Sequence, residues 1–195
     1  LIYLLHWNIF QLYLINEIIV ILDLLIYFGQ VCGFVGVASN VVQKDREWLS
    51  LATKKLIHRG PDDFGIRWFE DGKVGLGHRR LSIIDLSSAA HQPFVLSDLN
   101  LAIVFNGEIY NYLELRQQLI YKGHNFISDS DTEVLLRSYF TWGNDCLKKL
   151  NGMFSFVIYD LNKKEIFLAR DRAGEKPLFY RIDNERLFFT SELKA

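Results

Sequence analysis

Val31-Cys32-Gly33-Phe34-Val35-Gly36-Val37 is the stretch that sets the fold of this chain. From Gly33 to Ala38 the residues are apolar or small and partly β-branched, and Ser39-Asn40 follows them. A short run of this kind, bounded by turn residues, predicts a buried strand. The stretch has the character of a protein start, yet residues 1–31 stand before Cys32.

The segment before Cys32 is strongly apolar. Leu, Ile, Tyr and Phe dominate residues 1–30, and the first basic residue of the chain is Lys44. A secretory signal needs a positively charged n-region, and a membrane anchor usually has flanking Lys or Arg. Glu17 and Asp23 interrupt the run before it reaches the ~20 apolar residues that span a bilayer. The pattern therefore favours neither a signal peptide nor a membrane anchor.

The start of the chain is expected to have been assigned too early. The sequence opens on Leu, and its one methionine, Met153, lies deep in the globular part. On this expectation residues 1–31 are an apolar extension, Val31 is the initiator, and its removal leaves Cys32 first. The weaker alternative is a membrane helix through residues 1–28, in which each acid costs roughly 2.5–3.5 kcal/mol at mid-membrane.

Composition excludes several classes of protein. A net charge of −1 leaves no excess of Lys and Arg to neutralise phosphates, so nucleic acid is not expected as a partner. The two cysteines, Cys32 and Cys146, form neither a disulfide framework nor a metal motif, and no metal is expected. A reducing cytoplasm fits best, with residues 32–195 as one domain and Cys146 in its core.

Elements alternate along the domain. Apolar residues at helical spacing predict a helix from Asp45 to Ile57, with Asp45 as a candidate cap. Asn111 and Ser130 each precede a Glu by three residues, a capping-box spacing that predicts two further helices. Strands are predicted over residues 33–38, 64–69, 73–78, 99–105, 154–159, 165–169, 178–182 and 187–190.

The connections between these strands determine the architecture. Short turns such as Asp183-Asn184 force neighbouring strands to be antiparallel. Residues 154–159 show no clean polar alternation, so both faces of their sheet are expected to be covered. The sequence therefore predicts an α+β fold of four layers, an α/β/β/α sandwich with two stacked antiparallel sheets.

Cys32 offers unusual chemistry if it is the first residue. A free N-terminal cysteine carries a thiol and an α-amine that titrates near pH ~7.7–8.0, so that one residue supplies nucleophile and base. For a lone cysteine beside an apolar strand, the alternative is a buried structural residue.

Three further clusters supply complementary groups: a cation in Arg80, amide donors in Asn106-Gly107, and an anion in Asp131. Each is weak alone. Asn-Gly is a common hairpin turn, Arg80 could form a surface salt bridge, and Asp131 could simply complement a helix dipole. A carboxylate, an ammonium and a carboxamide are the groups that such a set can hold together, and free glutamine has all three.

Longer motifs run through the domain. They are Cys32-Gly33-Phe34-Val35-Gly36, His58-Arg59-Gly60-Pro61-Asp62, His78-Arg79-Arg80-Leu81-Ser82-Ile83, Asn106-Gly107-Glu108-Ile109-Tyr110-Asn111, Ser130-Asp131-Thr132-Glu133, Asn151-Gly152-Met153-Phe154 and Ala169-Arg170-Asp171-Arg172. With these motifs residues 32–195 resemble the glutaminase domain of class II glutamine amidotransferases, and most closely the asparagine synthetase branch.

The resemblance implies an N-terminal nucleophile hydrolase fold and assigns roles. Cys32 attacks the glutamine carboxamide, and its own α-amine moves the proton. Asn106 and Gly107 form the oxyanion hole and contact the substrate. The remaining glutamine-binding groups are Arg80 for the α-carboxylate, the backbone of Leu81, Ser82, Ile83 and Ile84 along the pocket, and Glu108 and Asp131 for the α-ammonium.

The resemblance also implies a second domain. In the synthetase family Ser191-Glu192-Leu193-Lys194-Ala195 leads into the last strands of the glutaminase domain and then into a domain that activates aspartate, so residues 32–195 are expected to be a C-terminally truncated glutaminase domain. ATP and Mg²⁺ are expected only in the following domain, not in this chain. L-glutamine and this synthetase domain are the expected partners. A homodimer is a possible state of the full-length protein.

Two alternatives stay open. The domain could serve another acceptor, as in the amino-sugar or purine branch of the amidotransferases. It could also bind without hydrolysing, because a residue before Cys32 turns the α-amine into an amide. The chain as written is therefore expected to be inactive as a glutaminase, and a protein that begins at Cys32 is expected to be active.

Overall fold

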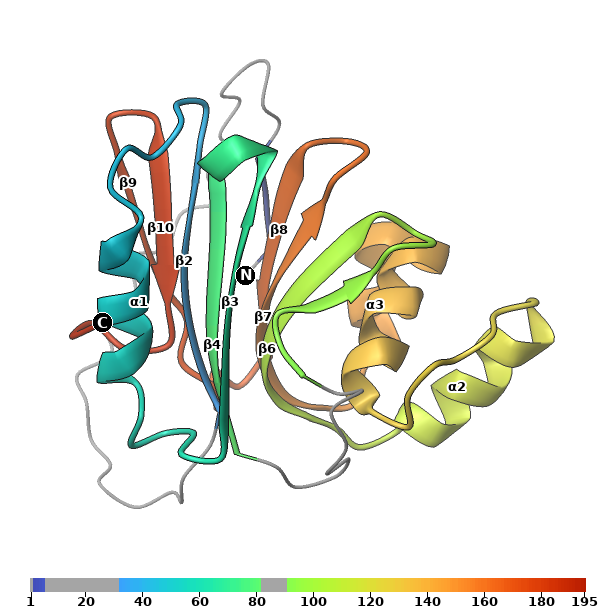
Figure 1. The fold of residues 1–195 in the computed structure, drawn as a ribbon. Coiled ribbons are helices and arrows are strands. Elements are labelled where there is room, and N and C mark those ends of the chain that lie inside the picture. The colour runs from blue at the N-terminus through green and yellow to red at the C-terminus, as the bar shows by residue number, and fades with distance from the viewer. Residues whose placement is uncertain (1, 6–31, 82–90) are drawn as a thin grey trace.

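A computed structural model describes residues 2–5, 32–81 and 91–195. In these parts of the chain two five-stranded antiparallel sheets lie face to face, and helices lie on their outer sides (Figure 1). The α/β/β/α sandwich of the α+β class that the sequence predicts is confirmed.

The first sheet, here called the β2 sheet, has the strand order β3-β4-β2-β10-β9. Its strands are β2 (Gly33–Ser39), β3 (Asp63–Phe69), β4 (Val74–Arg80), β9 (Phe179–Asp183) and β10 (Arg186–Thr190). The central strand β2 is buried along its whole length, as its apolar sequence predicts. It pairs with β4 on one side and with β10 on the other.

The second sheet, here called the β6 sheet, has the order β1-β8-β7-β6-β5. Its strands are β1 (Ile2–Leu5), β5 (Phe94–Leu96), β6 (Leu101–Ile109), β7 (Gly152–Asp160) and β8 (Glu165–Arg170). The sequence predicts neither β1 nor β5. Three residues after Pro93 are too few to show a strand pattern, and β1 is recognisable only from its pairing with β8.

Helix α1 (Glu47–Lys55) covers the β2 sheet, while α2 (Tyr112–Tyr121) and α3 (Asp131–Trp142) cover the β6 sheet (Figure 1). Two 3-10 turns, η1 (Glu70–Gly72) and η3 (Gly143–Lys148), complete the helical segments. The helix predicted over residues 45–57 is shorter at both ends. Asp45 lies just before it, where its carboxylate accepts a hydrogen bond from the Glu47 N–H at 2.9 Å.

Three apolar clusters fill the spaces between the four layers. One joins the β6 sheet to α2 and α3 and includes the fully buried Cys146, a second lies between the two sheets, and a third joins the β2 sheet to α1. Among the described residues, none of the helices has both the length and the apolar composition that a membrane crossing requires.

Candidate active site

Cys32 lies directly before β2, at the end of the sandwich where β4 and β6 end and α3 begins (lower end of Figure 1). Its half-buried thiol contacts the backbone of Leu81. The Sγ atom accepts a hydrogen bond from the Leu81 N–H at 3.3 Å and lies 3.5 Å from the Leu81 carbonyl oxygen, to which the S–H can donate. The end of β4 therefore fixes the position of the thiol.

The electrostatics of this thiol work in opposite directions. Burial raises the pKa of Cys32, and the Leu81 N–H and the Arg80 charge offset part of that rise. Asp131 adds to the rise. The thiol is thus protonated at neutral pH and needs a base before it can act as a nucleophile.

Arg80 is the last residue of β4 and is buried. Residues alternate along a strand, so Arg80 shares the inner face of the β2 sheet with Val74 and Leu76, which belong to the core between the sheets. Arg80 directly precedes Leu81, whose backbone contacts the Cys32 thiol, and the Arg80 charge acts to lower the pKa of that thiol.

Asn106 lies in β6 and is fully buried, yet neither its amide nitrogen nor its oxygen has a hydrogen-bond partner among the described residues. A buried polar group left unpaired costs about 1–3 kcal/mol. An orphaned carboxamide in a native core therefore calls for a functional reason.

Gly107 follows with a φ of +154°, and a Cβ on it would lie only 2.1 Å from the Met153 carbonyl oxygen. No other residue fits this close approach of β6 to β7. The glycine thus lets β6 and β7 stay closely paired next to the fully buried Asn106.

Asp131 begins α3, and its carboxylate accepts a hydrogen bond from the Ile109 N–H at 3.0 Å. Burial raises the pKa of Asp131 to about 6, and the negative charge of Glu108 contributes to this rise. A cation bound beside these carboxylates would stabilise the ionised form of Asp131.

The structure therefore brings Cys32, Arg80, Leu81 and Asp131 together through contacts or charge, with Asn106, Gly107 and Glu108 at the adjoining end of β6. Ser82, Ile83 and Ile84, predicted to line the pocket, lie outside the described residues.

The sequence motifs do not predict a pair of charged residues, Arg59 and Glu192, that lies next to Cys32. The Arg59 Nε donates to the Cys32 carbonyl oxygen at 3.2 Å, and its Nη1 bonds Glu192 at 2.9 Å, which His58 also contacts. Burial acts to raise the pKa of Glu192, but hydrogen bonds from Arg59, His58 and Lys194 hold it down at about 2. We call this the Arg59–Glu192 bridge. The motif from His58 to Asp62 supplies Arg59 and His58, but nothing in the motif indicates that they pair with Glu192.

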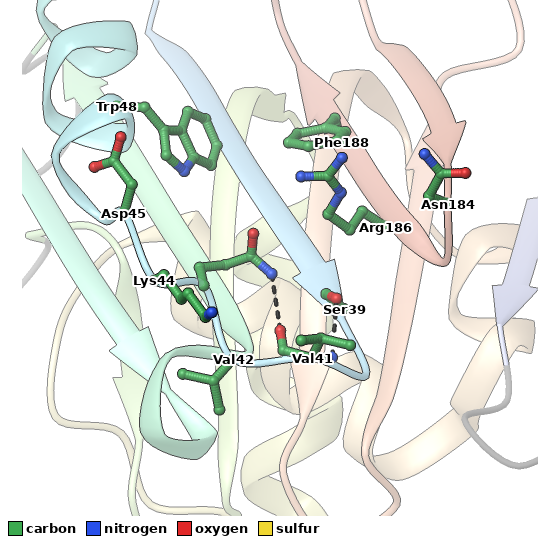
Figure 2. Close-up of a pocket in the computed structure, with 10 residues that line it drawn as sticks. Ser39, Val41, Val42, Lys44, Asp45, Trp48, Asn184, Arg186 and Phe188 are labelled. Carbon is green, nitrogen blue, oxygen red and sulfur yellow. Dashed lines mark hydrogen bonds between the residues drawn. The ribbon is translucent and has the colours of Figure 1, made fainter.

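A separate hollow of about 640 Å³ lies on the outer face of the β2 sheet. Figure 2 shows Trp48 and Phe188 on its walls, with Ser39 at its base. Ser39 is about 23 Å from Cys32 along β2, at about 3.3 Å per residue. The hollow is thus on another face and at the other end of the sheet, and it takes no part in the site.

The site thus lies at one end of a sandwich of two antiparallel sheets, with a cysteine directly before the central strand of one sheet. Residues 31–195 match the model of the glutamine amidotransferase domain, and the chain belongs to that family.

Relatives agree with this assignment. The chain is 44% identical over 168 residues to asparagine synthetase [glutamine-hydrolyzing] 1 of Bacillus subtilis (strain 168), a match that covers 84% of this chain and 26% of that protein. It is 40% identical over 180 residues to putative asparagine synthetase [glutamine-hydrolyzing] 2 of Methanocaldococcus jannaschii, covering 84% and 34%. The chain thus spans about a quarter to a third of these relatives.

A solved structure confirms the fold. Glutamine phosphoribosylpyrophosphate amidotransferase from B. subtilis aligns with a TM-score of 0.69 over 83% of this chain and 42% of that one. The sequence identity in this alignment is 24%, so the likeness concerns the fold alone.

Proposed function

We propose that this domain hydrolyses L-glutamine to glutamate and ammonia through a thioester on Cys32. The observation that carries the proposal is the contact of the Cys32 thiol with the backbone of Leu81, next to Arg80, together with the orphaned carboxamide of Asn106 in β6, whose end the Asp131 carboxylate contacts at Ile109. The charges of Arg80 and Asp131 both act on the pKa of the thiol. These groups complement the carboxamide, carboxylate and ammonium of free glutamine.

The Cys32 thiolate attacks the carboxamide carbon of glutamine. The C–N bond then breaks, and the leaving nitrogen takes up a proton and departs as ammonia. Water then hydrolyses the thioester to glutamate. The α-amine of Cys32 is the base that removes and returns protons, since the thiol itself is protonated at neutral pH. This amine exists only when Cys32 is the first residue, because after Val31 its nitrogen belongs to a peptide bond.

The remaining groups hold the substrate. Arg80 binds the α-carboxylate with its two-pronged guanidinium. The Asn106 side-chain amide and the Gly107 N–H stabilise the oxyanion, and one such donor is typically worth ~2.7–4 kcal/mol. The ammonium lies between Glu108 and Asp131. The backbone of residues 81–84 completes the pocket.

The ammonia serves an aspartate-amidating synthetase domain that uses ATP and Mg²⁺. The names of the relatives at 44% and 40% identity support this acceptor over the amino-sugar and purine branches. A cytoplasmic location and a homodimer of the longer protein belong to the same proposal.

The test uses one folded protein in two states. The full chain is expressed with a specific protease site before Cys32, so that cleavage after folding frees the α-amine. Ammonia and glutamate are then measured with glutamine as substrate. We expect turnover only after cleavage and none in Cys32→Ala. Equal turnover before and after cleavage contradicts the α-amine mechanism. Glutamine binding without turnover in the cleaved protein supports the non-catalytic alternative.

A further inference from the structure

Phe105 lies in β6 just beyond the end of its pairing with β5. That pairing runs from Leu96↔Leu101 to Phe94↔Ile103, and β5 begins at Phe94. On this side of β6, two buried side chains, rather than a neighbouring strand, form hydrogen bonds with the backbone N–H and carbonyl oxygen of Phe105. Its N–H donates to the Gln92 Oε1 at 2.7 Å, and its carbonyl oxygen accepts from the His78 Nε2 at 3.0 Å.

His78 comes from the opposite sheet. It lies in β4, directly across from Phe34 in β2, so it belongs to the strands that place Cys32 and Arg80. Since a carbonyl oxygen only accepts hydrogen bonds, the proton of the ring lies on Nε2. Burial lowers the pKa of His78 to about 4, which keeps the ring neutral at physiological pH.

We propose that His78 and Gln92 form a clamp on Phe105 that positions Asn106 and Gly107 as oxyanion donors relative to Cys32. The inference rests on the proposed glutaminase function. His78 and Gln92 do not touch the substrate in this proposal and are positioning residues. The clamp acts because Asn106 is the next residue along β6, so any shift of the Phe105 peptide moves the orphaned carboxamide with it.

The size of the effect follows from geometry. A misplacement of 1 Å at a reacting centre can cost about 10²-fold in rate. His78→Leu removes the donor and Gln92→Met removes the acceptor, each with similar side-chain volume. We expect kcat for glutamine hydrolysis to fall about 10- to 100-fold in each, with KM changed by less than about threefold because Arg80 and Asp131 are intact.

A conservative variant separates positioning from other roles. His78→Gln keeps an N–H donor at similar reach and is expected to recover most of kcat. The pH dependence of kcat keeps its shape in all three variants, because a neutral His78 is not the titrating base. Leu119→Ala is the control. Leu119 is a buried residue of α2 in the core outside the site, so its truncation lowers stability without affecting kcat. Loss of a pH inflection, or equal kcat in His78→Leu and the parent, overturns the clamp.

A second readout does not depend on activity. Amide hydrogen exchange at Phe105 and Asn106 is measured by NMR in the full chain. We expect faster exchange in His78→Leu and Gln92→Met than in His78→Gln or Leu119→Ala. Unchanged exchange in His78→Leu overturns the clamp whatever the enzyme activity. Absence of ammonia release from the cleaved parent, together with faster exchange in His78→Leu, overturns the proposed function and supports the clamp.

Discussion

At the scale of single residues, burial raises the pKa of the Cys32 thiol and the charge of Arg80 lowers it. The sequence identifies Cys32, Arg80, Asn106, Gly107 and Asp131 because each stands in a compact motif. It gives no role to the Arg59–Glu192 bridge, whose partners are 133 residues apart. Ion pairs between distant segments leave no local pattern, so only the fold reveals them.

Removing the charge of Arg80 is expected to slow modification of Cys32 in the full chain. Arg80 lowers the pKa of this thiol, so Arg80→Met raises it further and reduces the thiolate fraction. The rate of iodoacetamide labelling, followed by mass spectrometry across pH, should shift to higher pH. Arg80→Lys keeps the charge and serves as the control. An unchanged profile, or a shift to lower pH, in Arg80→Met contradicts this effect of the Arg80 charge.

Asp131 is expected to make both stability and substrate binding depend on pH. Its pKa is raised from 3.8 to about 6, so between these values the folded state binds a proton that the unfolded state has released. Relative to Asp131→Asn, the wild-type free energy of unfolding therefore falls as pH rises through this window and levels off above it. Urea unfolding along this range checks the sign.

The same titration affects the substrate, because only the ionised Asp131 can pair with an ammonium. KM for glutamine should rise as pH falls below about 6 in the cleaved protein. Asp131→Asn is expected to have a high KM that no longer varies in this range. A pH-dependent KM in the variant assigns the titration to another group.

At the scale of elements, two similar helix-start signals have different outcomes. Ser130 caps α3 as predicted, and its Oγ accepts from the Glu133 N–H at 3.3 Å. Helix α2 begins directly after Asn111, as predicted, but the Asn111 side chain does not cap it: it donates to the Lys149 carbonyl oxygen and accepts from the Asn151 N–H, each at 2.9 Å. An amide carries both a donor and an acceptor, so it can pair with a neighbouring backbone segment, which no local pattern reveals.

Ser130→Ala is expected to lower the free energy of unfolding by about 1 kcal/mol, the usual value of a lost N-cap. Ser130→Asp should retain the cap. The comparison is made by urea denaturation. Equal stability of Ser130→Ala and the parent means that Ser128, whose hydroxyl lies 2.9 Å from that of Ser130, takes over the cap.

Glu133 is expected to be the costliest single polar change in α3. Its side chain is fully buried, pairs with Arg137 at 2.8 Å and accepts from the Ser128 N–H at 2.7 Å. Glu133→Gln removes the close carboxylate from the buried Arg137, which keeps the longer pair to the exposed Asp98 carboxylate at 3.3 Å, and should cost about 3–5 kcal/mol. Glu133→Gln combined with Arg137→Met should recover part of that loss. No recovery in the double variant indicates that the loop hydrogen bonds, not the ion pair, carry the stability.

At the scale of the whole molecule, β7 explains why four layers could be predicted. Phe156 and Ile158 face α3, while Val157 and Tyr159 face the other sheet. A strand with apolar residues on both faces must be covered on both faces. The absence of alternating polar residues in the sequence of β7 therefore predicts a layer on each side. The strand order could not be predicted, because the pairing of β2 with β10 joins opposite ends of the domain.

Tyr159 tests how the core between the sheets tolerates polar atoms. Its hydroxyl is buried with no hydrogen-bond partner among the described residues, and its ring packs edge-on against Phe69 at 5.5 Å. Tyr159→Phe keeps the ring contact and removes the unpaired group, so Tm should stay equal or rise. A clear fall in Tm shows that the hydroxyl has a partner in solution, which buried water can supply.

The pairing of β2 has a consequence for how the chain is made. The Phe34 N–H bonds the Ser191 hydroxyl, 157 residues further along, and the Phe34 carbonyl oxygen accepts from the Ser191 N–H. A ribosome therefore delivers the strand behind Cys32 early and its flanking partner late. Until β10 emerges, the nascent chain therefore holds Cys32 without the strand that pairs beside it, and the proposed chemistry waits for that pairing.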